Sequence, residues 1–466
     1  MLSHYLRLRT APSYNNLPVE GSLLPNPNGR LSPKVFTGEE SFNHFDQDQY
    51  MLGYLLEHRI GERYTLRQNA RYGHLKLSYL SAQGEGAFVT LNPDAPSDPA
   101  NFRRVKRSIF GSTETASLFA IDNQVQGRWT FGRWQHLALL GADYQRANYD
   151  VVARNDGRIS DIDLFAPVHN DDISVSAPFL DGTSRLVQTG VYVQDQIKFD
   201  ERWVATLSGR YDHARTDNRD RAGSQSTSQS DYKFTQRAGL VYLASSGWAP
   251  YVSYATSFSP SSSIDPATGR AFKPETGRQY EAGLRFQPSG RTGSFSAAVF
   301  DLRRQNYVTT NPVSNLPKQS GEIAVKGLEV EATLQPIVGM NLTAAWTWTP
   351  KAEIVASDNP AEIGRQSSPV PKQQLSLWGD YLFANGFKVG LGARYVGANH
   401  GYDESAPVPV PGYTLFDAMA GYDFKPWSLA VNARNLTDKA AISTCSYGSC
   451  YYGDPRTVVA TATYRW

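Results

Sequence analysis

Apolar and polar residues alternate with a period of two along most of the chain, which is typical of β-strands with one apolar and one polar face. In the segment WVATLSGRYD, Trp203, Leu207 and Tyr211 share one face, and Ser208 and Arg210 share the other. The pattern predicts about 18 strands. They start near residues 2, 49, 63, 114, 134, 185, 202, 231, 249, 276, 293, 322, 340, 372, 387, 412, 427 and 456.

The connections between these strands alternate between short and long along the whole chain. Short turns such as IGER (60–63) and FDER (199–202) are separated by long polar stretches such as 10–48 and 80–113. A sandwich or a propeller has no reason to sort its loops in this way, whereas an outer-membrane barrel has short turns on one rim and long loops on the other. The sequence therefore predicts an all-β fold, an antiparallel transmembrane β-barrel.

Composition supports this fold class and excludes others. The 466-residue chain has a formal net charge of +2 and no run of basic residues, which argues against a nucleic-acid-binding protein. No apolar stretch approaches the ~18 residues of a membrane-spanning helix, and a mean hydropathy of −0.44 is compatible with alternating strands. The 26 tyrosines and 21 phenylalanines are typical of aromatic girdles. The first segment, MLSHYLRLRT, lacks the apolar core of a signal peptide.

Few residues suggest chemistry. The two cysteines, Cys445 and Cys450, are close in sequence, which favours a local disulfide in an oxidising compartment over two free thiols. The eight histidines are scattered without a metal-binding motif, so no metal site is predicted. The acidic segment 161–172 could bind a hard cation such as Ca²⁺, but a solvated loop is the favoured interpretation. No combination of nucleophile, base and orienting group is recognisable, so the chain is not predicted to be an enzyme and has no catalytic residues.

Charged residues occupy the polar face in the middle of several strands, where they would point into the lumen. We expect them to form ion-pair networks there. They are Arg210, Asp212, Glu281, Arg285, Glu329 and Glu331.

Several segments, in order along nearly the whole chain, resemble TonB-dependent ferric-siderophore receptors, and among these the ferrichrome and hydroxamate receptors. The matching segments are TGVYVQDQIKFDERWVATLSGRYD, SFSPSSSIDPATGRAFKPETGRQYEAGLRF, SGEIAVKGLEVEA, VPKQQLSLWGDY, NARNLTDKAA and CSYGSCYYGDPRTVVATATYRW. The resemblance implies a bacterial outer-membrane barrel of 22 strands with an N-terminal plug that contacts TonB. Neither the plug nor the TonB-contacting segment is recognisable, so residues 1–466 are expected to be an N-terminally truncated barrel domain that lacks about four strands.

The resemblance also points to site residues. Tyr14 and Asn16 match ligand-contacting positions of the first long loop, and Gln83 and Glu85 replace two aromatic contacts of the second. Val152 and Ala153 replace an aromatic pair in the third loop, so the aromatic cage for ferrichrome is mostly missing and another hydroxamate or ferric chelate is expected. The family commonly has a cysteine pair in the last long loop, where Cys445 and Cys450 lie.

The closing segment TVVATATYRW resembles the last strand of family members, which ends on an aromatic residue read by the barrel-assembly machinery. Val458, Ala460, Ala462 and Tyr464 would then face lipid, with Trp466 at the periplasmic interface. This strand either closes onto residues 2–9 or remains an open edge.

The implied function is uptake of a ferric siderophore, of the hydroxamate type, by a monomeric receptor energised through TonB in the full-length protein. The ligand is an Fe(III)-siderophore, and no covalent cofactor is expected. Partners would be outer-membrane lipid or lipopolysaccharide and the barrel-assembly machinery, with TonB reached only through the plug, and no nucleic acid. Without a plug the chain alone is expected not to transport. A passive outer-membrane pore and a nonfunctional receptor fragment remain as alternatives.

Overall fold

The computed structural model describes the chain except for residues 13–15, 156, 170–172, 222–225, 262–270, 289–291, 311–316, 320, 358–359, 367–369, 402–407 and 447. The fold is all-β. Helical structure among the described residues consists of two short 3-10 turns, η1 (Pro99–Phe102) and η2 (Pro360–Glu362). None of the helical segments in this part of the chain is long and apolar enough to cross a membrane.

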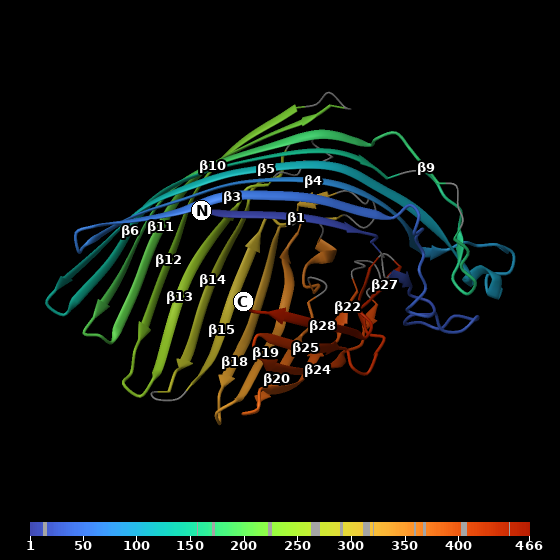
Figure 1. Ribbon diagram of the computed structural model, residues 1–466. Helices are drawn as coiled ribbons and strands as arrows, with labels where there is room; N and C mark the ends of the chain where they lie inside the picture. The colour runs from blue at the N-terminus through green and yellow to red at the C-terminus, as the bar shows by residue number, and fades with distance from the viewer. Residues whose placement is uncertain are drawn as a thin grey trace.

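One large sheet forms the wall of the molecule (Figure 1). Its strands are β1 (Leu2–Thr10), β3 (His44–Ile60), β4 (Tyr64–Phe88), β5 (Arg104–Phe131), β6 (Trp134–Arg154), β10 (Leu180–Phe199), β11 (Trp203–Asp220), β12 (Ser226–Tyr242), β13 (Trp248–Ser259), β14 (Glu275–Phe286), β15 (Gly293–Gln305), β18 (Glu322–Leu334), β19 (Met340–Ala356), β20 (Gln373–Leu382), β21 (Phe387–Val396), β24 (Tyr413–Phe424), β25 (Trp427–Arg434) and β28 (Thr457–Tyr464). A nineteenth strand, β8 (Ile162–Asp163), pairs with the loop-side end of β5. The predicted fold class and the predicted number of about 18 strands are confirmed.

Each wall strand pairs antiparallel with the next one along the chain, from the β1–β3 pair to the β25–β28 pair. We call the strands from β1 to β12 the N-terminal wall and those from β13 to β28 the C-terminal wall. The remaining strands belong to the long connections. They are β2 (Asn16–Pro18), β7 (Gly157–Arg158), β9 (Ser174–Val175), β16 (Val308–Thr310), β17 (Pro317–Gln319), β22 (Asn399–His400), β23 (Pro409–Val410), β26 (Ile442–Ser446) and β27 (Ser449–Tyr452).

The first and last wall strands do not pair with each other. All residues of β1 and β28 are exposed, and their recorded partners are β3 and β25. Of the two outcomes expected for the closing strand, direct closure onto residues 2–9 or an open edge, the structure has the open edge.

The short and long connections lie on opposite rims of the sheet, with the short turns along the lower left of Figure 1 and the long connections toward the right. Aromatic pairs from neighbouring strands line the short-turn rim. Trp134 and Phe199 have ring centroids 4.4 Å apart, and Trp248 and Phe286 are also 4.4 Å apart. Such a band is the interfacial girdle of a membrane barrel.

The two faces of the wall differ in chemistry, as the alternation predicts. On the outer face the middle of the strands is apolar and exposed, with Val191 and Leu207 56% and 52% accessible. The next residues along the same strands, Tyr192 and Ser208, point inward with the charged groups described below. The outer face therefore suits lipid, and the inner face suits a polar lumen.

Candidate functional site

On the inner face of the N-terminal wall, Tyr192 of β10 lies flat against the neighbouring strand β6. A Cβ added to Gly141 would approach the Tyr192 ring to 2.2 Å, so the ring occupies the space that a side chain would need. The Tyr192 hydroxyl donates a hydrogen bond to Asp122 Oδ1 at 2.6 Å. The glycine and the carboxylate together keep the ring against the wall and out of the lumen.

Arg210 of β11 links this tyrosine to two further carboxylates. Its Nη2 donates to Asp143 Oδ1 at 3.0 Å and to Asp212 Oδ1 at 2.6 Å, and its guanidinium lies 5.4 Å from the centroid of the Tyr192 ring. Gln188 donates a further hydrogen bond to Asp212, which is almost fully buried. The predicted lumenal ion pair between Arg210 and Asp212 is therefore present, and it belongs to a connected network.

The C-terminal wall contains a similar arrangement. The ring of Tyr251 covers Gly283, where an added Cβ would come within 2.5 Å, and its hydroxyl donates to Glu281 at 2.6 Å. The Arg285 guanidinium lies 5.3 Å from the centroid of that ring. Glu329 and Glu331 face the same lumen, but neither has an ion-pair partner within the described chain. For these two glutamates the expected ion-pair network therefore stays a prediction.

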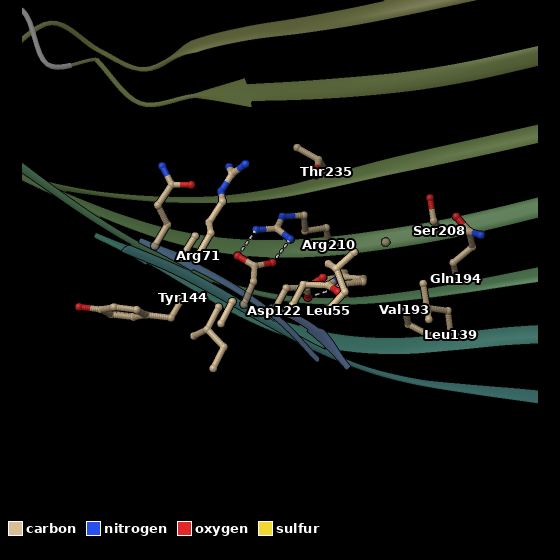
Figure 2. A pocket seen from close by; sticks show the side chains of 18 of the residues that line it. Leu55, Arg71, Asp122, Leu139, Tyr144, Val193, Gln194, Ser208, Arg210 and Thr235 are labelled. Atoms are coloured by element: carbon tan, nitrogen blue, oxygen red, sulfur yellow. Dashed lines mark hydrogen bonds and ion pairs between the residues drawn. The ribbon is translucent and has the colours of Figure 1, made fainter. Parts of the chain in front are cut away.

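A cavity of about 820 Å³ lies against the inner face of the N-terminal wall. Its apolar side includes Leu2 and Leu55, and its polar side includes Asp122, Arg210 and Arg71. Figure 2 shows the side chains of Asp122 on β5 and Arg210 on β11, which line this wall together, and dashed lines mark hydrogen bonds between the residues drawn. The cavity is large enough for a small molecule and offers both hydrogen-bonding and apolar surface.

The long connections pack together around a small apolar core at the extracellular rim. This core joins the connections that follow β1, β6, β21 and β25 to the loop-side end of β5. Its buried members are Leu17, Val19, Leu31, Val105, Ile162, Leu164, Val410, Ile442, Cys445, Cys450 and Tyr452. The long connections therefore form a structured layer.

A three-stranded sheet within this layer joins the first long connection to the last. β2 pairs with β27 through Leu17 and Cys450, and β27 pairs with β26. A disulfide links Cys445 to Cys450 across the β26–β27 hairpin, with the two Cα atoms 3.9 Å apart. The Val19 amide donates to the Gly448 carbonyl at 3.0 Å. The ends of the sheet, unpaired along β1 and β28, are thus joined through their loops.

The predicted ligand residues fall in and beside this layer. Asn16 of β2 is buried, and its Nδ2 donates to the Gly84 carbonyl at 3.2 Å and to Ser449 Oγ at 3.3 Å. Gly84 lies between Gln83, which is half-buried, and Glu85, which is exposed. The structure therefore brings three of the four predicted residues together, with Asn16 as the link behind the other two. Tyr14 lies outside the described residues.

Two other predicted positions lie elsewhere. Trp466 is fully exposed beyond the end of β28, and its ring centroid is 6.4 Å from that of Tyr464 at the short-turn rim. In the acidic segment, Asp163 accepts hydrogen bonds from Arg103 at 3.0 Å and from the Phe165 amide at 2.8 Å. Those contacts give the Asp163 carboxylate a role in the turn.

Three aromatic residues near the extracellular end were not singled out from the sequence. Phe45 of β3 and Tyr79 of β4 are paired residues with ring centroids 5.8 Å apart, and Phe110 of β5 is 5.7 Å from Tyr79. Tyr79 and Gln83 lie four residues apart on one strand, so both belong to the inner face. The alternation of inward and outward residues that assigns Arg71 to the inner face also assigns Tyr79 to it. This alternation is the signal in the sequence that predicts an aromatic residue on the inner face here.

A buried ion pair holds the first connection to the extension of β5. Arg107 Nη1 and Glu39 Oε1 are 2.7 Å apart, with side chains 0% and 3% exposed. Arg107 Nε also donates to the Ser160 carbonyl at 2.7 Å, and His169 Nδ1 lies 2.9 Å from the Gly38 carbonyl oxygen. Buried charges of this kind are stable only when they are paired.

At the opposite rim, two neighbouring short turns bind each other. Arg133 Nε donates to Asp200 Oδ1 at 3.0 Å, and the Asp200 amide donates to the Arg133 carbonyl at 3.0 Å. The hydrogen bond from Arg133 lowers the pKa of the Asp200 carboxyl below its ordinary value. Asp200 and Glu201 both have positive φ, at 53° and 56°, which is uncommon for residues other than glycine.

Comparison with known proteins places the chain in a family. The family model "TonB dependent receptor-like, beta-barrel" matches residues 2–436. The chain is 32% identical to the ferrichrome outer membrane transporter/phage receptor of Escherichia coli K12 over all of its own length and 65% of that protein. It is 33% identical to the ferrioxamine B receptor of Salmonella typhimurium over 97% of its length and 63% of that protein. It thus spans somewhat less than two thirds of these curated relatives.

Solved structures agree on the fold. The ferric-catecholate import receptor Fiu of E. coli K12 superposes with a TM-score of 0.84 at 19% identity, covering 99% of this chain and 71% of that one. The siderophore receptor PiuA of Acinetobacter baumannii gives a TM-score of 0.85 at 21% identity, with 99% and 70% covered. The chain therefore belongs to the TonB-dependent receptor β-barrel family of the outer membrane, a family of transport receptors and not of enzymes.

Proposed function

We propose that the protein takes part in the uptake of a ferric siderophore of the hydroxamate type, as an outer-membrane receptor that is energised through TonB in the full-length protein. The observation that carries the proposal is the hydrogen bond from Asn16 to the Gly84 carbonyl, because it joins the first long connection to the stretch that holds Gln83 and Glu85. The similarity to receptors named for ferrichrome and ferrioxamine B supports the same substrate class.

The chemistry of these residues suits a noncovalent site for a chelate with a polar rim. The Gln83 amide can donate to the carbonyl oxygens of a hydroxamate chelate, and the rings of Phe45, Tyr79 and Phe110 offer apolar surface to its linkers. The exposed carboxylate of Glu85 favours a chelate with a positive charge over a neutral one. We therefore expect ferrioxamine B, which keeps a free ammonium group, to bind more tightly than neutral ferrichrome.

Binding to outer-membrane fractions that contain the protein tests the proposal. The probes are ferric ferrioxamine B, ferrichrome and a ferric catecholate. Glu85→Gln should weaken ferrioxamine B binding about tenfold and leave ferrichrome nearly unchanged, since only the charge interaction is lost. Glu201→Gln, at the opposite rim, is the matched control and should change neither. Tightest binding of the catecholate, or equal effects of both glutamate variants, would contradict the proposal.

The geometry does not favour a passive pore over a receptor, because the unpaired outer edges of β1 and β28 would leave either kind of barrel open to lipid. The match to receptor proteins supports the receptor function, which is the one that we carry forward.

The outer face also suits contact with lipopolysaccharide, the lipid partner suggested by the sequence. Arg146 of β6 and Arg185 of β10 lie nearer to the long loops than Tyr144 and Tyr211 do. By register, both arginines are on the outward side of the wall. Arg185 is exposed and interacts electrostatically with Asp217 opposite it, and Arg146 Nε donates to Asn148 Oδ1 at 3.3 Å. Guanidinium groups above an aromatic band fit lipid phosphates, so the double variant Arg146→Gln/Arg185→Gln should reduce the lipopolysaccharide that copurifies with the protein.

A further inference from the structure

The junction between β12 and β13, where the two walls meet, has the shortest ladder between consecutive strands of the wall, the short loop strand β8 apart. It contains five residue pairs, from Arg237 opposite Ala255 to Val241 opposite Tyr251. On its other side β12 pairs with β11 along its whole length, and β13 pairs with β14 along its whole length. Both strands are therefore regular, and only the junction between them is short.

The ladder ends at a side chain inserted between the two backbones. Gln236 would be the next residue to pair, opposite Thr256. Instead its amide donates to Thr256 Oγ1 at 2.9 Å, and that hydroxyl lies 3.4 Å from the Gln236 carbonyl oxygen. One hydroxyl thus replaces the backbone partners of Gln236, which ends the pairing and holds the two strands apart.

Among the described residues, the next side-chain hydrogen bond across this junction lies further toward the long-loop rim than Gln236. Gln229 Nε2 donates to the carbonyl of Phe272, a buried residue shortly before β14, at 3.0 Å. Within the part of the chain that the structure describes, the recorded ladder partners of β12 between Gln229 and Gln236 all lie on β11. Gln236 is six residues from the end of β12 at the short-turn rim, about 15 Å up a tilted strand, so the gap begins near the middle of the membrane.

The inside and the outside of the gap differ in polarity. On the inside, the cavity of about 820 Å³ is lined by Thr235 and Arg237 from β12 and by Ala255 and Thr256 from β13. On the outside, Phe234 is 58% exposed toward lipid. Unpaired backbone groups are costly in lipid, but polar groups next to a hydrated lumen can be satisfied by water. The lumen can therefore keep such a gap stable.

We propose that the β12–β13 junction is a lateral seam at which the barrel wall opens. The β11–β12 hairpin moves away from β13 above Thr256, and the five pairs below it act as the hinge. Movement at the seam widens the extracellular mouth and the cavity behind it without breaking any longer ladder. This conformational device goes beyond the proposed uptake function and does not depend on which chelate the receptor binds.

Residue-level hydrogen exchange of the intact chain in lipid vesicles tests the seam. Amides of 231–235 that point toward β13 should exchange at least tenfold faster than amides of the same segment that point toward β11. Thr256→Val removes the hydroxyl at constant shape and should speed exchange of the Gln236 amide about tenfold, whereas Thr256→Ser should restore protection. Uniform protection along 231–235 would overturn the proposal, and this measurement needs no variant to fold.

Disulfide cross-linking gives an independent test with a matched control. Gly239 and Ser253 are paired within the ladder, and Thr235 and Ser257 would stand opposite each other four residues further if the ladder continued. Both pairs occupy the same kind of position in the antiparallel repeat. Their cysteine variants therefore differ only in whether the pair lies within the ladder or beyond its end. Gly239→Cys/Ser253→Cys should oxidise completely, and Thr235→Cys/Ser257→Cys slowly and in part. Equal rates would contradict the seam.

Discussion

The N-terminal and C-terminal walls have the same inner-face chemistry but differ in length. From β3 to β12 the strands have 17 to 28 residues, whereas those of the C-terminal wall have 8 to 17. About 9–11 residues are enough to cross a membrane in a tilted strand. The long strands of the N-terminal wall therefore continue well beyond the membrane, and the short strands barely exceed it.

This difference shows which part of the wall serves the membrane and which serves the mouth. In both walls a tyrosine covers a glycine and donates to a carboxylate, which gives a smooth polar lining at membrane depth. The N-terminal wall extends furthest, into ribbons such as the ends of β4 and β5, against which the long connections pack. The candidate binding residues Gln83 and Glu85 lie on one of these ribbons.

The largest expected effect separates the extracellular core from the exposed strand surface. Arg107→Ala removes the guanidinium that pairs with the buried Glu39 carboxylate and leaves it with the His169 ring, whose Nδ1 is 3.7 Å from Glu39 Oε1, so it should lower the free energy of unfolding of the extracellular core by about 3–5 kcal/mol. Protease cleavage of the long connections, measured against denaturant concentration, reports that loss. The control is Arg215→Ala, which breaks an exposed pair with Asp217 and should cost less than ~1 kcal/mol. Equal effects of the two variants would mean that the core does not depend on its buried pair.

Strand boundaries show where the sequence was informative. At the short-turn rim, predicted starts near 63, 134, 202 and 249 agree within one residue with Tyr64, Trp134, Trp203 and Trp248. At the loop rim the predicted start near 114 lies ten residues after Arg104. Lipid imposes apolar residues on one face only within the membrane, so the strand pattern weakens once a strand leaves it, although the backbone continues to pair.

The candidate site was predicted only in part, for a related reason. Glu85 and Gln83 were assigned to one loop, but their link to Asn16 joins residues 68 positions apart, and the β2–β27 pairing joins the two ends of the chain. No local pattern encodes contacts of such sequence separation. The alternation places the aromatic group around Tyr79 on the inner face, but alternation alone does not distinguish a ring that contacts a ligand from one that lines the wall.

A matched pair of glycine substitutions tests whether the two walls share one lining. Gly141→Ala and Gly283→Ala each place a methyl group within 2.5 Å of a tyrosine ring, Tyr192 or Tyr251. Displacing the ring strains the packing and breaks a hydrogen bond to a carboxylate, so each variant should lose about 2–3 kcal/mol of stability. Heat resistance of the folded band in SDS gels measures the loss. A large effect in one wall and none in the other would show that the two linings are not equivalent.

The disulfide tests how far the extracellular layer depends on a covalent link. The double variant Cys445→Ser/Cys450→Ser removes a cross-link between residues separated by five positions, which should cost about 2 kcal/mol because so short a loop constrains the unfolded chain only modestly. Faster proteolysis of the last long connection, with unchanged heat resistance of the wall, is the expected result. Reducing agent should reproduce the effect in the unmodified protein and add nothing to the variant. Loss of wall stability as well would show that the layer and the wall unfold together.

The smallest effect concerns the short-turn rim, where the walls have no packed layer. The hydrogen bond from Arg133 depresses the pKa of Asp200 below its ordinary value of 3.8. A carboxyl group with a depressed pKa in the folded state contributes stability above its unfolded pKa, and the contribution disappears as the pH falls through the folded pKa. Because the pair is exposed, stability should change only slightly with pH over this range.

The measurement is the urea concentration at the unfolding midpoint as a function of pH. Asp200→Asn should reduce the fall of this midpoint at acidic pH, and Arg133→Gln should do the same. A midpoint that falls equally in the wild type and in both variants would assign the acid sensitivity to other carboxylates, such as Glu201 in the same turn, whose pKa is lowered by a hydrogen bond from Lys198.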